Sequence, residues 1–267
     1  MRIFVIVVLI LGASVGATPR TTWTYTAMGD SFATGETFDP NYNVTPYVTR
    51  YQGYLAADNG VTVTLFNLGR HGMTSGQLLN NLLTNTTFQA DLPQSDVITW
   101  NIGVNDFSGA RANYLSGHCG KGKGDNQDCL RTAVANFTTN WDHIVVQILS
   151  RRSAGNTIIR TMDLFNPWIA VDQATNTTPD NRETGPARGN NFQVLEYYLD
   201  QMNDHMAQSA SANGFLLARV HDAFNGLSGT EDPVVKGLIA PDGEHPNDVG
   251  AELIAQVFRN LGYAPLR

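Results

Sequence analysis

The sequence has few cysteines, few charged residues and no long apolar run. Two of its 267 residues are cysteine, 15% are charged and 42% are hydrophobic, with both types spread along the chain. This composition is typical of a globular protein, and a chain of this length can bury a full core without disulfide staples. The longest early apolar run, residues 3–11, is shorter than the roughly 20 residues that span a membrane. We therefore expect no stable membrane insertion.

The first residues are typical of a signal peptide. Arg2 precedes the apolar run 3–11, and small residues follow up to Ala17. We predict that residues 1–17 are a signal peptide and that residues 18–267 form a single domain. Removing Arg2 from the 17 basic residues leaves 16 against 24 acidic ones, and such an acidic balance disfavours nucleic acid and anionic membranes as partners. We expect a secreted, extracellular monomer.

Two further features agree with export. Cys119 and Cys129 flank a polar, glycine-rich stretch, and in an exported chain an even cysteine count favours a disulfide between them over two free thiols. Asn-x-Ser/Thr motifs are glycosylation acceptors in secreted eukaryotic chains. The sequence places four of them at Asn43, Asn85, Asn136 and Asn176.

Short apolar runs rich in β-branched residues alternate with stretches of helical period. This alternation predicts an α/β fold in which helices cover both faces of a parallel sheet, so that each strand is buried on both faces. The predicted strands are residues 22–28, 61–68, 97–102, 157–164 and 215–220. Apolar residues at three- and four-residue steps predict helices over 130–149 and 192–206, and Pro246 and Asn247 predict the start of a last helix that ends near Asn260.

Residues that can carry chemistry follow these strands, at the sheet edge where α/β proteins bind ligands. Ser31 lies in a tight turn directly after the first strand, although a Gly-Asp-Ser tripeptide alone favours a helix cap. A serine nucleophile needs a base, and the base needs a third group that orients it. Of the six histidines, only His245 has an aspartate three residues upstream, Asp242. The sequence therefore predicts Ser31, His245 and Asp242 as nucleophile, base and orienting acid.

Hydrogen-bond donors for a developing oxyanion are available after the second and third strands. Asn105, in Ile102-Gly103-Val104-Asn105-Asp106, can aim its side-chain amide into the cleft. After the second strand, the N–H of Gly69 or of Gly72 can approach closely, because no side chain projects from a glycine Cα. Each segment alone is also compatible with an ordinary βα turn. Four such segments at four strand ends make the arrangement specific.

These four segments resemble the conserved blocks of the SGNH hydrolase superfamily, the GDSL esterase/lipase family. The first block resembles Gly29-Asp30-Ser31, with Phe32 at the usual leucine position. The glycine of the second block falls better on Gly72 than on Gly69. The Gly-x-Asn-Asp block matches residues 103–106, and the terminal Asp-x-x-His block matches residues 242–245. The resemblance thus spans nearly the whole mature chain.

This resemblance implies a three-layer α/β/α sandwich around a central, mostly parallel five-stranded sheet, the flavodoxin-like SGNH fold. It implies that Ser31 attacks the substrate while Asp242 supports His245 as the proton carrier. It also implies that the N–H groups of Ser31 and Gly72 and the side chain of Asn105 form the oxyanion hole.

The activity implied by the resemblance is hydrolysis of carboxylic esters through an acyl-enzyme, with small-molecule, lipid or polysaccharide esters as substrates. We favour short-chain or acetyl esters because no lid-like amphipathic segment is evident. Residues 164–168 are expected either to form a wall of the acyl pocket or to pack their loop onto the core.

Motifs of other enzyme classes are missing from the sequence. It has no Gly-x-Ser-x-Gly, no His-Glu-x-x-His and no Cys/His cluster of metal-ligand spacing. Residues 117–124 lack the Ser/Thr of a phosphate-binding loop. We therefore expect no cofactor and no metal. The alternative is a non-catalytic secreted module that binds glycan or lipid in the same cleft, but such a module would be expected to have lost Ser31, Asn105 or His245.

Overall fold

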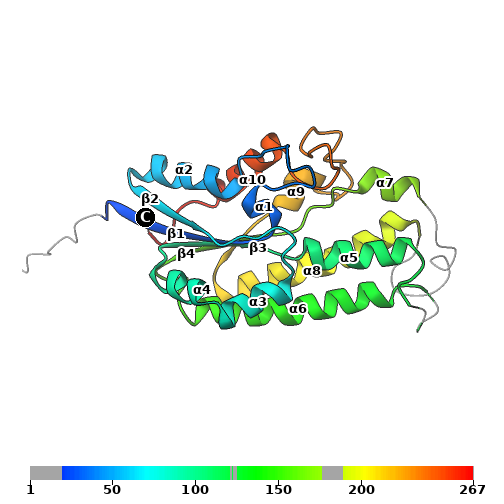
Figure 1. Ribbon diagram of the computed structural model, residues 1–267, viewed down its shortest axis with the longest axis horizontal. Helices are drawn as coiled ribbons and strands as arrows, with labels where there is room; N and C mark the ends of the chain where they lie inside the picture. Colours follow the sequence, from blue (N-terminus) through cyan, green and yellow to red (C-terminus); the bar gives the residue numbers. More distant parts are fainter. Residues whose placement is uncertain (1–19, 121, 123–124, 176–188, 267) are drawn as a thin grey trace, which may run out of the picture.

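A computed structural model of the chain describes residues 20–120, 122, 125–175 and 189–266 (Figure 1). The predicted signal peptide and the sequon at Asn176 lie outside the described residues. Five strands form one sheet in the order β2-β1-β3-β4-β5, and every pair in it is parallel. The strands are β1 (Thr22–Gly29), β2 (Thr62–Asn67), β3 (Val97–Asn101), β4 (Ile158–Met162) and β5 (Leu216–Ala218). The predicted α/β fold is confirmed.

Helices cover both faces of this sheet, as Figure 1 shows. One face carries α1 (Ser31–Thr34), α2 (Tyr47–Asn59), α9 (Val220–Asn225) and α10 (Asp248–Asn260). The other carries α3 (Ser75–Thr84), α4 (Thr86–Asp91), α5 (Val104–Leu115), α6 (Asp128–Leu149) and α8 (Asn191–Asn213). The short helices η1 (Leu92–Gln94) and α7 (Ile169–Ala174) lie in the connections. The result is the three-layer sandwich that the resemblance implies.

The central strands are buried on both faces, whereas the edge strands are not. All five residues of β3 and of β4 are buried, and Trp100 packs at the middle of the core with ring-centroid distances of 5.6 Å to Trp141 and 5.2 Å to Phe215. In β2 only Val63 is buried. In β5 only Ala218 is buried. The prediction that every strand is buried on both faces is therefore wrong for β2 and β5, because an edge strand lacks a neighbour on one side.

The last helix, α10, packs against the loop that carries His245, the predicted base. Asn247 caps α10 by accepting hydrogen bonds from the N–H groups of Val249 and Gly250, at 2.9 and 3.0 Å, which confirms the predicted helix start. A Cβ on Gly250 would lie only 2.2 Å from the carbonyl oxygen of Leu238. Glycine therefore lets α10 pack directly against the segment before His245, and this contact holds the loop in place.

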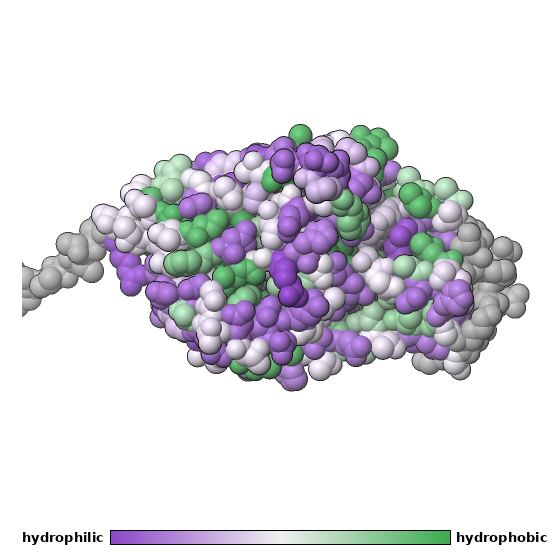
Figure 2. Space-filling view, viewed as in Figure 1, coloured by the Kyte–Doolittle hydropathy of each residue, from purple (hydrophilic) through white to green (hydrophobic). Residues whose placement is uncertain are grey.

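The surface on the side shown in Figure 2 mixes hydrophilic and hydrophobic residues, and the hydrophobic ones form separate groups. Among the described residues, no helix combines the length and the apolarity needed to cross a membrane.

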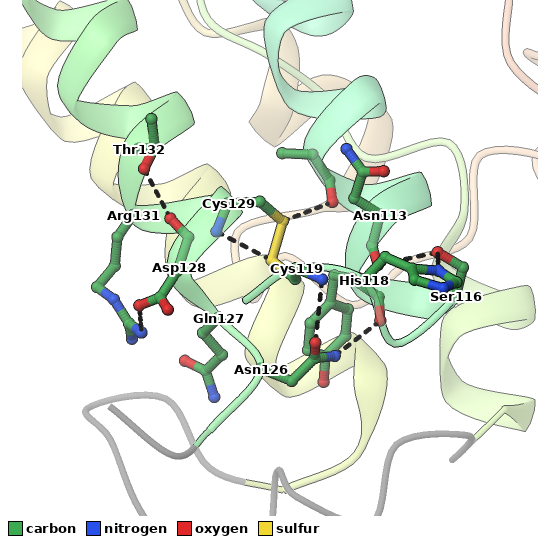
Figure 3. The surroundings of a disulfide bond; sticks show 12 residues. Asn113, Ser116, His118, Cys119, Asn126, Gln127, Asp128, Cys129, Arg131 and Thr132 are labelled. Carbon is green, nitrogen blue, oxygen red and sulfur yellow. Dashed lines mark hydrogen bonds and ion pairs between the residues drawn. A yellow bond between two sulfur atoms is a disulfide. The ribbon is translucent and has the colours of Figure 1, made fainter. Parts of the chain in front are cut away.

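The two cysteines form a disulfide, as predicted, between the loop after α5 and the first turn of α6 (Figure 3). Around the disulfide, Asn126 accepts a hydrogen bond from the N–H of Cys119 at 3.0 Å and donates to the carbonyl oxygen of Tyr114 at 3.0 Å. The Cys129 N–H donates to the carbonyl oxygen of Cys119 at 2.8 Å. Local hydrogen bonds thus hold both ends of the loop at bonding distance.

Replacing both cysteines with serine should lower the free energy of unfolding by slightly less than 3 kcal/mol. The bridged residues are 10 apart, and the chain-entropy estimate for a 15-residue loop is ~3 kcal/mol. Urea unfolding of the Cys119→Ser, Cys129→Ser variant measures the difference. Equal unfolding midpoints for the variant and the oxidised protein would show that the bridge does not stabilise the fold.

Candidate active site

The first strand ends in a turn that presents Ser31. Gly29 lies beside Asn101 on β3, and a Cβ on Gly29 would lie 2.2 Å from Asn101 Oδ1, so only glycine fits. Asp30 Oδ1 accepts hydrogen bonds from the Phe32 N–H at 3.0 Å and from Asn101 Nδ2 at 2.6 Å. Asp30 therefore caps α1. The hydroxyl of Ser31 is left available for another partner.

That partner is His245. Ser31 Oγ lies 2.9 Å from His245 Nε2, and His245 Nδ1 lies 2.8 Å from Asp242 Oδ2. Ser31 and His245 are 3% and 2% exposed. The structure thus brings together, across 214 residues of sequence, the three residues that the sequence nominates. An imidazole held on one side by a carboxylate and facing a hydroxyl on the other can take a proton from that hydroxyl.

The carboxylate of Asp242 is held by the backbone as well as by the imidazole. Its Oδ1 accepts hydrogen bonds from the N–H groups of Glu244 and His245, both at 3.0 Å, and its Oδ2 accepts one from Phe38 at 3.0 Å. Burial alone would raise the pKa of Asp242, but these three donors and the nearby imidazole lower it below its usual value. Asp242 therefore stays ionised and can accept a hydrogen bond from the Nδ1–H group of His245.

The environment of His245 favours its neutral form. Burial lowers the pKa of the imidazole, the Asp242 carboxylate opposes this effect, and the nearby His71 lowers the pKa further. The ring of His71 stacks on that of His245 at 5.7 Å, and the ring of Phe38 meets His245 edge-on at 4.7 Å. Neutral imidazole is the form that can act as a general base.

Activity should rise with pH as His245 loses its proton. Because the pKa of His245 is lowered, kcat/KM should reach half its plateau below pH ~6.5, the value of an unperturbed histidine. Replacing His71 with glutamine removes a neighbouring group that lowers the pKa of His245 and should shift the midpoint to higher pH. Initial rates at low substrate concentration across the pH range test both results. A flat profile from about pH 4 to about pH 8 would contradict a histidine base.

Two of the predicted oxyanion donors lie in neighbouring segments, Asn105 in the first turn of α5 and Gly72 in the loop before α3. Asn105 Nδ2 donates to the carbonyl oxygen of Met73 at 3.0 Å, which leaves its second N–H for another acceptor. The N–H of Gly72 has no acceptor among the described residues, whereas the N–H of Gly69 donates to Asn67 Oδ1 at 3.1 Å. Of the two glycines, therefore, only Gly72 has an N–H without an acceptor in the described part of the chain.

The loop that carries Gly72 is fixed from the far side by Asp106. The carboxylate of Asp106 accepts hydrogen bonds from the N–H of Ser75 at 2.8 Å and from its hydroxyl at 2.6 Å. Burial raises the pKa of Asp106, and the bonds from Ser75 oppose that shift. Asp106, next to Asn105, thus ties the start of α3 to the start of α5 and fixes the segments that carry Gly72 and Asn105 relative to each other.

Sequence analysis missed three residues around the triad. Asn101 is buried and connects Asp30 to the hydroxyl of Tyr47, which donates to Asn101 Oδ1 at 3.1 Å. Phe38 and His71 enclose His245. A polar residue at the end of an otherwise apolar strand is a signal that could have found Asn101. Nothing in the local sequence marks Phe38 or His71.

The segment after β4 packs into the core. Phe165 is buried and stacks on Phe32 at 5.2 Å and on Phe224 at 4.2 Å. Trp168 is also buried, beneath the guanidinium of Arg111 at 4.6 Å. Of the two roles expected for residues 164–168, the structure therefore shows packing of the loop onto the core. Phe165 supports Phe32, the neighbour of Ser31.

A pocket of ≈ 500 Å³ lies beside the triad, between the loop after α1 and His71. Polar side chains predominate in its lining, which includes Thr34, Glu36, Thr37, Asp39, Tyr42 and Asn43. Such a lining can form hydrogen bonds with a polar ligand.

Comparison with known proteins gives one family and several similar structures. The model of the GDSL-like Lipase/Acylhydrolase family matches residues 27–253. A comparison with curated proteins finds no match. The lipase Lip_vut3 from a goat rumen metagenome is 20% identical with a TM-score of 0.68, covering 92% of this chain and 100% of that one. The acetylxylan esterase Axe2 from Geobacillus stearothermophilus is 19% identical with a TM-score of 0.58, covering 90% and 94%. Both share the fold.

Proposed function

This chain belongs to the GDSL-like lipase/acylhydrolase family and is a carboxylic ester hydrolase, and we propose that it acts through a Ser31–His245–Asp242 triad. The observation that carries this proposal is the continuous pair of contacts from Ser31 Oγ to His245 Nε2 and from His245 Nδ1 to Asp242 Oδ2, at 2.9 and 2.8 Å. Among the similar structures are catalytic mutants of Axe2, one with a serine and one with a histidine replaced by alanine. These two residue types agree with the proposal.

In the acylation step, Ser31 Oγ attacks the ester carbonyl carbon while His245 Nε2 takes the hydroxyl proton. Asp242, ionised by its backbone donors, stabilises the imidazolium that forms. The tetrahedral intermediate then collapses. The bond to the alcohol oxygen breaks, His245 gives that oxygen the proton, and the acyl group remains on Ser31.

The deacylation step repeats the same proton transfers with water. His245 takes a proton from the attacking water, and the carboxylic acid leaves when Ser31 regains its proton. In both steps we propose that the negative carbonyl oxygen accepts hydrogen bonds from the N–H groups of Ser31 and Gly72 and from the side chain of Asn105. Each N–H is preorganised, so little reorganisation is needed as the charge develops.

We propose short-chain esters, above all acetyl esters of polar alcohols, as the substrates. The polar pocket beside the triad supports a hydrogen-bonding alcohol, and the core packing of Phe165 and Trp168 removes the most apolar candidates for a long acyl site. Axe2 is an acetylxylan esterase and Lip_vut3 is a lipase, and these two activities define the alternatives to test.

A hydrolysis panel separates these alternatives. It uses nitrophenyl esters from acetyl to long-chain acyl groups, together with acetylated xylan, and the Ser31→Ala variant as the blank. We expect kcat/KM to be highest for acetyl esters and to fall with acyl length. A preference for long-chain esters would reject the proposed substrate class. It would not reject the proposed triad, because the Ser31→Ala variant tests the triad separately.

Replacing Asn105 with alanine should lower kcat by about 10²- to 10³-fold with little change in KM, because the lost hydrogen bond forms mainly in the transition state. If Asn105 served only to hold the carbonyl of Met73, the main loss would be in thermal stability. Measuring kcat and the melting temperature on one preparation distinguishes these roles. Near-normal turnover by the folded variant would remove Asn105 from the oxyanion hole.

We also propose that the protein acts outside the cell. The Cys119–Cys129 disulfide supports this because structural disulfides persist in oxidising compartments. The described sequon residues Asn43, Asn85 and Asn136 are exposed, so a glycosylating host could modify them. Amino-terminal sequencing of protein from the culture medium should begin after Ala17, and a mature protein that keeps Arg2 would reject the cleavage.

A further inference from the structure

A second group of titratable side chains lies beyond the carboxyl ends of β4 and β5 and shares no residue with the triad. Glu196 and Asp200 are one turn apart on α8, and His221 lies in the first turn of α9. One ligand-capable atom from each lies within 4.8 Å of the other two. His221 Nε2 is 3.1 Å from Glu196 Oε1. We call these three residues the Glu196 cluster.

The pocket around the Glu196 cluster concentrates negative charge. Its volume is ≈ 240 Å³, and three more carboxylates, Asp163, Asp204 and Asp222, line it. Apart from His221, Arg219 is the one basic residue in this lining, and its side chain is 56% exposed. Carboxylates held this close together repel one another unless a cation lies among them.

Asp163 gives an independent indication of a missing partner. It is 1% exposed, and its Oδ1 accepts a hydrogen bond from the N–H of His221 at 2.7 Å. Its Oδ2 is buried without a hydrogen-bond partner, and the nearest cation, Arg219 Nη1, is 3.7 Å away. A buried carboxylate oxygen without a partner is costly. Because Asp163 lines the same pocket, a cation or a cation-bound water there would satisfy it.

We propose that Glu196, Asp200 and His221 bind a divalent transition-metal cation of the Zn²⁺ or Mn²⁺ type, with Asp163 accepting a hydrogen bond from a metal-bound water. One imidazole with two carboxylates suits these ions, whereas Ca²⁺ takes six to eight oxygen ligands. Ligand bonds of about 2.0–2.2 Å in a tetrahedron place neighbouring ligand atoms about 3.3 Å apart. His221 Nε2 and Glu196 Oε1, which share a hydrogen bond at 3.1 Å, are already close to that spacing, and all three ligand atoms lie within 4.8 Å of one another.

One of the proposed ligands, Glu196, is also oriented by a neighbouring side chain. Glu196 Oε2 accepts a hydrogen bond from Asn166 Nδ2 at 2.8 Å, which orients the carboxylate in the way that hydrogen bonds commonly orient metal ligands. Glu196 and His221 are separated by 25 residues, so no short motif in the sequence marks the complete set of ligands.

The proposed role of the cation is structural. It would join α8 on one face of the sheet to α9 on the other (Figure 1). Through Asn166 it would also hold the segment that carries Phe165, whose ring stacks on Phe32 next to Ser31. The cation takes no part in ester chemistry here, so its binding can be measured without an activity assay.

The test is titration of Zn²⁺ and Mn²⁺ into the full chain after EDTA treatment, followed by calorimetry and by the melting temperature. We expect one of these ions to bind with one equivalent per chain and to raise the melting temperature, and EDTA to reverse the rise. No saturable binding of either ion, or saturable binding of Ca²⁺ in their place, would overturn the proposal.

Two ligand variants and one control make the test specific. Asp200→Asn and His221→Gln should each weaken binding by more than about 10-fold, since even partners outside the ligand set change affinity by 10- to 100-fold. Asp200 is exposed, and its side chain makes no hydrogen bond to the described residues, so its variant should fold. The control is Asp142→Asn, because Asp142 Oδ1 faces His205 Nε2 at 2.8 Å in a pair outside the cluster. If the control weakens binding as much as Asp200→Asn does, the ion lies elsewhere and the proposal fails.

Discussion

Replacing Ser31 with alanine is expected to lower kcat by about 10⁴- to 10⁶-fold, because the variant lacks the oxygen that accepts the acyl group. The fold should be preserved. Asp30, not Ser31, caps α1, and alanine is the best helix former at an interior position. The melting temperature should therefore stay close to that of the unmodified protein while turnover is lost.

A matched control for this variant is Ser95→Ala. Ser95 is also buried, and its hydroxyl makes hydrogen bonds of 2.6 Å with Thr26 Oγ1 and 2.9 Å with the carbonyl oxygen of Asp91. It precedes β3, at the end of the strand away from Ser31. Ser95→Ala should lower stability by about 1 kcal/mol and leave kcat nearly unchanged. The assignment of Ser31 fails if Ser31→Ala keeps more than a tenth of the normal turnover.

Replacing Asp242 with asparagine is expected to lower kcat by about 10⁴-fold, with the geometry of the loop kept. An amide cannot stabilise the imidazolium as a carboxylate does, and it can hold His245 in the tautomer that carries no acceptor toward Ser31. The substitution affects His245 directly, because Asp242 Oδ2 lies 2.8 Å from His245 Nδ1. Steady-state kinetics near neutral pH measures the loss.

Asp242 also accepts the N–H of Phe38 at 3.0 Å, so a structural role must be separated from a catalytic one. A mainly structural role would appear as a lower melting temperature with nearly normal kcat in the folded fraction. The control is Asp248→Asn, which changes an exposed aspartate at the start of α10 and should leave kcat unchanged. Equal kcat for the two variants would exclude Asp242 from the triad.

The strands, and the contact between Asp242 and His245, could be predicted because their signals are local. Each strand is a short apolar run between turns, and Asp242 and His245 are three residues apart in one turn. The exposure of β2 could not be predicted, because it depends on the position of the strand in the sheet. An edge strand and a central strand can have the same apolar run.

The surroundings of the triad could not be predicted because they depend on contacts between distant segments. Asn101 reaches Asp30 across 71 residues, and Phe38 reaches Asp242 across 204. The need for glycine at residue 69 has the same kind of origin. A Cβ on Gly69 would lie 2.9 Å from the Cβ of Ala33 on α1. Such contacts are set by packing of the layers, and no spacing within the sequence encodes them.

The most direct test of the central claim is peptide mapping after reaction with a fluorophosphonate probe. We expect one covalent adduct, on Ser31, because in the proposed triad this serine is activated by His245 at 2.9 Å. We also expect labelling to be slowed strongly in the His245→Ala variant. An adduct on a different serine, or no adduct on protein that hydrolyses esters, would contradict the proposed triad.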